Sequence, residues 1–212
     1  MSITIVLVII TVAVSYFAFK DQALFYKLAH WPYQEKRTKS YYRLLTSGFV
    51  HGSWLHLLIN MFVLWTFGEL IESFFVQFFG SVMGPALFML VYLATVICAS
   101  LPNTFRKQDD QSYISVGASG GVSGIVFIYI LFFPWRDLYI YGILPIPAIV
   151  AGILYLAYSS YASKKGTDRI DHDAHFYGAL FGVLFMILLR PRSISDFFQS
   201  LIHEFPLGMI IF

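Results

Sequence analysis

Residues 117–133 have the sequence GASGGVSGIVFIYILFF, and this stretch decides the class of fold. None of its residues is charged, and the run ends at Pro134-Trp135-Arg136. A helix that crosses a bilayer needs about 20 mostly apolar residues, with a range of roughly 17 to 25. The stretch therefore predicts a membrane-spanning helix with glycine and serine residues concentrated at its start.

The whole chain has the composition of a membrane protein. It has 212 residues, of which 58% are apolar and only 12% charged, and its mean hydropathy is +0.70. Soluble domains carry about 25% charged residues, so this composition excludes a soluble enzyme and a disordered chain. The net charge of +2, without a basic stripe, excludes a nucleic-acid-binding protein. The single cysteine, Cys98, excludes an internal disulfide.

Five further apolar runs flank the first one, which predicts a single domain. We expect an all-α membrane protein, a polytopic bundle of six transmembrane helices at residues 2–19, 54–75, 85–101, 117–133, 138–162 and 174–189. The runs do not alternate as barrel strands would, so they must be helices. Pro145 and Pro147 predict an irregular start for the fifth span. The tail, residues 193–212, mixes apolar and charged residues and is expected to lie at the membrane interface.

The long first loop, residues 20–53, is rich in tyrosine and also contains Trp31. Such rings favour the membrane–water interface, so we expect this loop to rest on the membrane surface of a multi-pass protein in a cell membrane. Eleven of the 14 lysines and arginines fall in the loops after spans one, three and five. The positive-inside rule would place those loops in the cytoplasm, but the rule has exceptions where a loop folds on the membrane, so the sequence leaves the orientation open.

Polar groups lie near the starts of the second, fourth and sixth spans. They are His51, His56 and Asn60, then Ser119, then His175. A polar side chain inside a span is a functional-site hypothesis by default. Because these three spans run in the same direction, their polar groups must lie toward one side of the membrane at similar depth.

Glycines on these spans would let the helices approach closely. They are Gly117, Gly121, Gly124, Gly178 and Gly182, and their spacing is typical of helix packing in membranes. Close approach of the fourth and sixth spans would bring Ser119 near His175.

A serine near a histidine indicates nucleophilic catalysis. A serine hydroxyl becomes a good nucleophile when a base such as His175 takes its proton. No acid lies within the sixth span, which favours a Ser-His dyad over a triad. The Asn60 amide, the His56 ring and the backbone N–H of Ser119 are candidate donors to an oxyanion. His51 lies five residues before His56 and off its helix face, so a structural and an accessory catalytic role are equally open.

These motifs resemble those of the rhomboid family of intramembrane serine proteases. The matching patterns are G-x-S-G at 117–120, A-H-x-x-G-x-x-x-G at 174–182, H-x-x-x-x-H-x-x-x-N at 51–60 and F-G-x-x-x-E at 67–72. The resemblance implies that Ser119 is the nucleophile and His175 the base. It further implies that His56 and Asn60 donate hydrogen bonds to the oxyanion.

The resemblance also implies a reaction. It is hydrolysis of a peptide bond in or near the transmembrane segment of another membrane protein, with small residues at the cut and with the fifth span as part of a gate. The expected partners are such segments and the lipid bilayer, and no nucleic acid, metal or cofactor is implied.

Two residues depart from the family pattern. Tyr42-Arg43 stands where members often have Trp-Arg, and Ser123 stands where many have a tyrosine or phenylalanine that packs on the catalytic ring. A catalytically inactive rhomboid-like protein that binds membrane clients is the main alternative function. A transporter is disfavoured by the missing inverted repeat. Zinc and aspartyl intramembrane proteases need H-E-x-x-H or paired intramembrane aspartates, which the spans lack.

Overall fold

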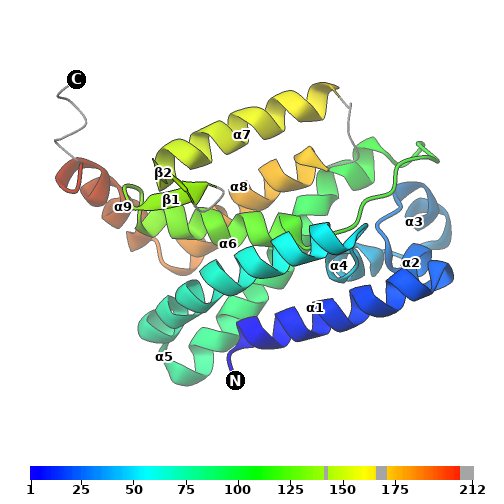
Figure 1. Ribbon diagram of the computed structural model, residues 1–212, viewed down its shortest axis with the longest axis horizontal. Coiled ribbons are helices and arrows are strands. Elements are labelled where there is room, and N and C mark those ends of the chain that lie inside the picture. Colours follow the sequence, from blue (N-terminus) through cyan, green and yellow to red (C-terminus); the bar gives the residue numbers. More distant parts are fainter. Residues whose placement is uncertain (141–142, 166–170, 206–212) are drawn as a thin grey trace.

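The first helices form one long span followed by a folded loop. The structure is a computed structural model that describes residues 1–140, 143–165 and 171–205 (Figure 1). Helix α1 is Ile3–Lys20, and Ser2 caps its start by accepting a hydrogen bond from the N–H of Ile5. The loop that follows contains the short helices α2 (Gln22–Leu28), α3 (Pro32–Thr38), α4 (Arg43–Thr46) and η1 (Ser47–Phe49).

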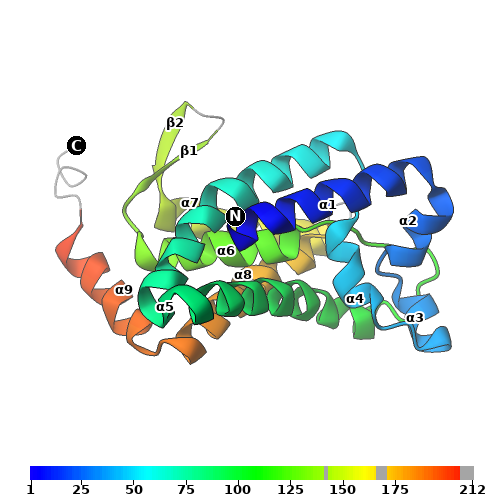
Figure 2. The same ribbon diagram turned by 90° about the horizontal axis from the view of Figure 1, so that it is seen from below.

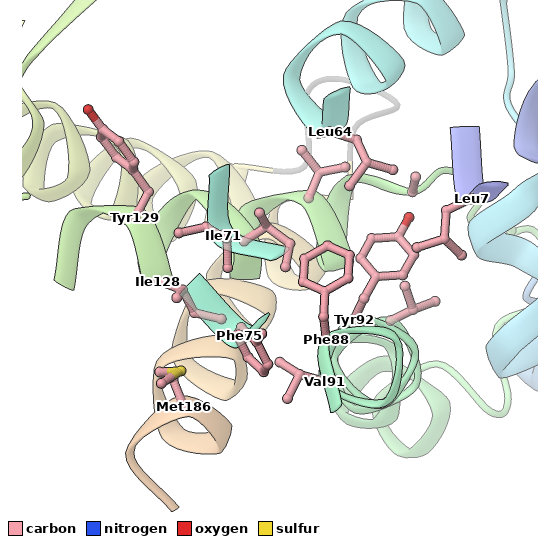
Figure 3. Packing of buried hydrophobic residues seen from close by; sticks show 14 of the residues in the cluster. Leu7, Leu64, Ile71, Phe75, Phe88, Val91, Tyr92, Ile128, Tyr129 and Met186 are labelled. Carbon is pink, nitrogen blue, oxygen red and sulfur yellow. The ribbon is translucent and has the colours of Figure 1, made fainter. Parts of the chain in front are cut away.

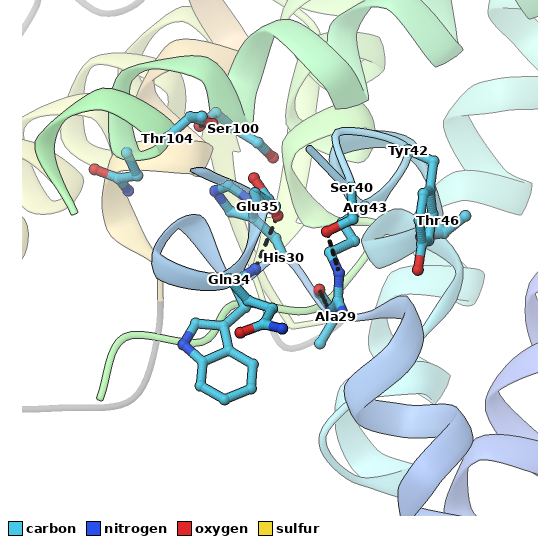
Figure 4. A network of polar contacts seen from close by, with 12 residues as sticks. Ala29, His30, Gln34, Glu35, Ser40, Tyr42, Arg43, Thr46, Ser100 and Thr104 are labelled. Atoms are coloured by element: carbon cyan, nitrogen blue, oxygen red, sulfur yellow. Dashed lines mark hydrogen bonds and ion pairs between the residues drawn. The ribbon is translucent and has the colours of Figure 1, made fainter. Parts of the chain in front are cut away.

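Buried polar contacts hold this loop together (Figure 4). Nδ1 of His30 lies 2.8 Å from Oε1 of Glu35, and both side chains are buried. The guanidinium of Arg43 donates to the backbone carbonyls of Tyr26 and Ala29, at 2.5 and 3.0 Å. Because charges this deeply buried need partners, these contacts fix one conformation for the loop.

Helix α5, Trp54–Arg106, contains the second and third expected spans as two arms. The arms meet at Gly80, whose φ of 85° and ψ of 166° are not helical. In Figure 2 both arms extend from this turn toward the end of the molecule that holds α2, α3 and α4. Phe75 and Phe88 stack edge to face across the arms, with ring centroids 5.9 Å apart. Glycine tolerates this positive φ because it has no Cβ.

The expectation of a purely α-helical chain is wrong between the fourth and fifth spans. Helix α6 is Ser119–Phe132, and strands β1 (Asp137–Ile140) and β2 (Leu144–Pro147) follow it as an antiparallel pair in which Asp137 faces Pro147. Helix α7 then begins at Ala148 and ends at Lys165. The irregular start expected at residue 138 is therefore a hairpin, because the two prolines of β2 cannot donate the N–H bonds of a helix interior.

The last two helices are α8 (His172–Leu189) and α9 (Arg192–His203). On α9, Ile194, Phe198 and Ile202 recur every four residues and are exposed, so they form an apolar face that suits a membrane interface. Residues 206–212 of the expected interfacial tail lie outside the described residues.

The packed core lies where α5, α6 and α8 meet (Figure 3). Among the described residues, α1, α5 and α8 are long and apolar enough to cross a membrane, and α6 is apolar but shorter. Phe75 and Phe88 of α5, Ile128 of α6 and Met186 of α8 are all fully buried in this core. Packing of this kind fixes the three helices relative to one another, and with them the polar groups at their starts.

Candidate active site

The starts of α5, α6 and α8 lie at one end of the molecule, beside the folded loop (Figure 1). Asn60, Ser119 and His175 fall within the first two turns of these three helices. The structure thus places the starts of the three helices that carry these residues at the same end of the molecule.

The backbones of α6 and α8 touch at glycines. A Cβ on Gly178 would lie 2.9 Å from the Cα of Gly120, and one on Gly182 would lie 2.8 Å from the carbonyl carbon of Gly124. Real Cβ atoms essentially never come this close to backbone, so only glycine fits. Gly120 is a packing residue that the sequence reasoning missed, although its four-residue spacing from Gly124 was a usable signal.

Ser119 and His175 therefore both lie close to this contact, because Ser119 precedes Gly120 and His175 is three residues before Gly178. Ser119 lines a small cavity of about 10 Å³ together with Gly120 and with Ala174, the neighbour of His175. Ser119 and His175 are both partly buried. A space of this size holds about one water molecule.

Gly117 has a different role from the helix packing expected of it. It lies before α6, and its φ of 129° is in the range that favours glycine. A Cβ there would lie 2.7 Å from Cε1 of His56. The missing side chain of Gly117 thus makes room for the His56 ring two residues before Ser119. By contrast, Gly121 meets the expected packing role, because a Cβ there would contact Val96 and Tyr92 of α5.

His51 holds the peptide that precedes Ser119. Its Nε2 accepts a hydrogen bond from the N–H of Ala118 at 3.3 Å, and its Nδ1 lies 2.9 Å from Oγ of Ser15. The Ser15 hydroxyl donates to the carbonyl of Phe49, so we assign the imidazole proton to Nδ1. Burial, and then the nearby ring of His56, lower the pKa of His51 to about 3. His51 is therefore neutral and positions the Ala118 peptide.

The starts of α5 and α6 carry hydrogen-bond donors. The Asn60 amide donates one N–H to the carbonyl of His56 at 3.0 Å, which leaves its second N–H for another acceptor. Helix α6 begins at Ser119 without a side-chain cap. The first N–H groups of a helix have no partner within it and carry partial positive charge, so this end suits an anion.

The two acids nearest His175 hold the start of α8 in place. Asp171 accepts hydrogen bonds from Asn103, Tyr113 and the N–H of Ala174, at 2.9, 2.5 and 3.0 Å. Asp173 accepts from Ser163 of α7 at 2.5 Å and from Arg106 of α5 at 3.4 Å. These contacts tie the start of α8 to α5, to α7 and to the loop before α6.

One aromatic neighbour of His175 was missed by the sequence reasoning, which left the tyrosines of the fifth span as packing and interface residues. The ring of Tyr155, on α7, stacks on His175 with centroids 5.9 Å apart and planes 18° from parallel. The Tyr155 hydroxyl is hydrogen-bonded to Oγ of Ser123 at 2.6 Å. The sequence did contain a signal for this contact, because Tyr155 lies on the same helix face as Gly152 and Ser159, three and four residues away.

Comparison with known proteins gives consistent matches. A family profile described as "Rhomboid domain" matches residues 38–192. Rhomboid-like protein 11, chloroplastic, of Arabidopsis thaliana is 31% identical over 74% of this chain and 56% of its own length. Presenilin-associated rhomboid-like protein A, mitochondrial, of Danio rerio is 31% identical over 68% of this chain and 36% of its own. Rhomboid protein 1, mitochondrial, of Saccharomyces cerevisiae is 26% identical over 67% of this chain and 40% of its own. The chain spans about half or less of the length of these relatives.

Proposed function

This chain belongs to the rhomboid family, and from that membership and the site geometry we propose that it is an intramembrane serine endopeptidase. The observation that carries the proposal is the backbone contact between Gly120 of α6, which follows Ser119, and Gly178 of α8, three residues after His175. The chain is a polytopic, mostly helical membrane protein.

The proposal includes six spans and a position in a cell membrane. The spans are α1, the two arms of α5, α6, α7 and α8. The apolar exposed faces of α1 and α5 support this arrangement, since large hydrophobic side chains there face outward.

In the first half of the reaction, Oγ of Ser119 attacks the carbonyl carbon of the scissile peptide bond, and its proton passes to His175. The carbonyl oxygen becomes an oxyanion. The backbone N–H of Ser119, the second N–H of the Asn60 amide and the His56 ring are its donors. The tetrahedral intermediate collapses as the C–N bond breaks and His175 gives its proton to the leaving amine. An acyl-enzyme on Ser119 remains.

In the second half, a water molecule attacks the acyl carbon while His175 takes a proton from the water. The new intermediate breaks its bond to Oγ, which regains the proton from His175. The products are one carboxylate and one amine, and the enzyme returns to its starting state.

The proposed substrates are other membrane proteins, cut in or near a transmembrane segment. The site lies at the level of the first helical turns, so a substrate bond must reach that depth as extended chain. Small residues at the cut suit a site closed in by backbone contacts of glycine.

The test uses the purified chain with a model transmembrane substrate and with a serine-directed fluorophosphonate probe. The wild-type chain should cleave the substrate and become labelled, and Ser119→Ala should do neither. Ser73→Ala is the matched control, because Ser73 is an exposed serine on α5 remote from the site. Full cleavage by Ser119→Ala would refute the proposal.

An inactive client-binding protein is the alternative outcome of the same experiment. In that case the wild-type chain would retain the model segment without cutting it, and the probe would not label Ser119. The intact pair Ser119 and His175 favours the protease.

A further inference from the structure

Helix α7 packs on the rest of the molecule through a narrow stripe. Its buried residues are Ala148, Gly152, Ser159 and Ala162, all of them small. Tyr155 completes the same stripe, because the spacings from 148 to 162 are then four, three, four and three residues. Tyr155 is the large side chain at the centre of this stripe, and Ile149 and Leu156 beside it are also half-buried.

The ring of Tyr155 is held at its tip and at one side by α6. Its hydroxyl is hydrogen-bonded to Ser123 at 2.6 Å, and its ring lies 5.9 Å from that of Phe127 at an interplanar angle of 43°. Ser123 and Phe127 are four residues apart, so they share one face of α6. With its tip fixed in this way, the ring presents a flat surface to His175, with the planes 18° from parallel.

We propose that Tyr155 is a positioning residue for His175, with Ser123 as the residue that fixes Tyr155. The inference rests on the proposed function and deepens it. Stacking restricts rotation of the imidazole, so that its ring stays aimed for proton transfer with Ser119. In this chain the ring that stacks on His175 comes from α7, and Ser123 of α6 holds its hydroxyl.

The supporting ring lies on α7, whereas Ser119 lies on α6 and His175 on α8. The His175 ring is stacked against Tyr155 only while α7 stays packed on α6. Tyr155 belongs to α7, and Ser123, which fixes its hydroxyl, belongs to α6. A displacement of α7 would separate Tyr155 from both Ser123 and His175. The position of α7 and the orientation of the His175 ring are thereby linked in one side chain.

The first experiment compares three variants in initial-rate assays. Tyr155→Leu removes the ring, and its kcat should fall about 100-fold with little change in KM, as expected for misplacement of a catalytic group. Tyr155→Phe keeps the ring and loses one hydrogen bond, so it should lose only about five- to tenfold. Tyr161→Leu is the control, since Tyr161 is an exposed tyrosine of the same helix.

A double variant tests whether the position of the ring matters more than the packing of α7. Tyr155→Ala combined with Ser123→Tyr places an aromatic ring on α6 instead of α7, and it should recover part of the kcat that Tyr155→Ala alone loses. Equal losses in Tyr155→Phe and Tyr155→Leu would overturn the inference. A Tyr155→Leu kcat within about twofold of wild type would overturn it as well.

A spectroscopic measurement separates this inference from the proposed function. NMR of histidine-labelled protein should show the His175 ring signals shifted by the stacked ring. The shift should be lost in Tyr155→Leu and kept in Tyr155→Phe. Unchanged signals in Tyr155→Leu refute the stacking role even if the chain is an active protease. A wild-type chain without protease activity refutes the proposed function, whatever the NMR shows.

Discussion

Replacing Gly178 by alanine adds one methyl group at the contact between α8 and α6. The new Cβ would lie 2.7 Å from the carbonyl carbon of Gly120, whereas contacts below 3.4 Å are already tight for real Cβ atoms. The helices must therefore separate by at least about 0.7 Å, because the obstacle is backbone and cannot rotate away. Overpacking of this kind costs about 1–3 kcal/mol of stability.

The same displacement should lower the catalytic rate by a larger factor than it lowers the folded fraction of the protein. Gly120 is adjacent to Ser119, and Gly178 lies three residues after His175 on the same face of α8, so the shift falls between the proposed nucleophile and the proposed base. A misplacement of about 1 Å costs roughly 100-fold in rate, so we expect kcat of Gly178→Ala to fall between tenfold and 100-fold.

The assay is cleavage of a transmembrane substrate in detergent, with rates expressed per folded molecule after size-exclusion chromatography. Gly52→Ala is the matched control, because the nearest atom to a Cβ there is a Val116 methyl at 4.0 Å. The reasoning would be refuted by a folded Gly178→Ala protein with wild-type kcat.

Three further predictions concern the surroundings of the site. Gly117→Ala introduces strain at a φ of 129° and pushes on His56, so kcat should fall by the ~10²–10³ typical of a lost oxyanion donor; wild-type rates would contradict this. Folding lowers the pKa of His51 from 6.5 to about 3, so the fold favours its neutral form. Protonation of His51 should therefore lower the free energy of unfolding as the pH falls from 6.5 toward 3, by an amount on the order of 5 kcal/mol in all, and should have no effect above pH 6.5. The free energy of unfolding of His51→Gln should depend less on pH than that of the wild-type protein. Parallel pH curves for the two proteins would exclude His51 as the cause. Glu72 accepts hydrogen bonds from both N–H and hydroxyl of Thr4, so Glu72→Gln should destabilise the protein by about 1.5–3 kcal/mol in denaturant unfolding while kcat per folded molecule stays unchanged; an unchanged unfolding midpoint would count against the contact.

The sequence alone was sufficient for the family and for the polytopic helical class of fold. Hydropathy is a local property, and lipid cannot satisfy polar groups, so runs such as residues 117–133 predict their own environment. The polar residues inside such runs were conspicuous for the same reason. The motif around Ser119 and the motif around His175 therefore pointed to serine chemistry before any contact between them was known.

Contacts between distant residues were decided by tertiary structure. The link from Ser123 to Tyr155 spans 32 residues and follows from no local pattern, because many polar or aromatic partners could reach an isolated serine. The role of His51 depends on the approach of Ala118, 67 residues away. The hairpin of β1 and β2 is a smaller case, since prolines exclude a helix but do not specify strand pairing.

The local sequence thus determines which chemical groups the candidate site contains, but it does not determine their geometry. Residue type and hydropathy set which groups are buried in the membrane. The orientation of the His175 ring depends instead on how closely α6, α7 and α8 pack, and that distance is set by side-chain volumes on three helices at once.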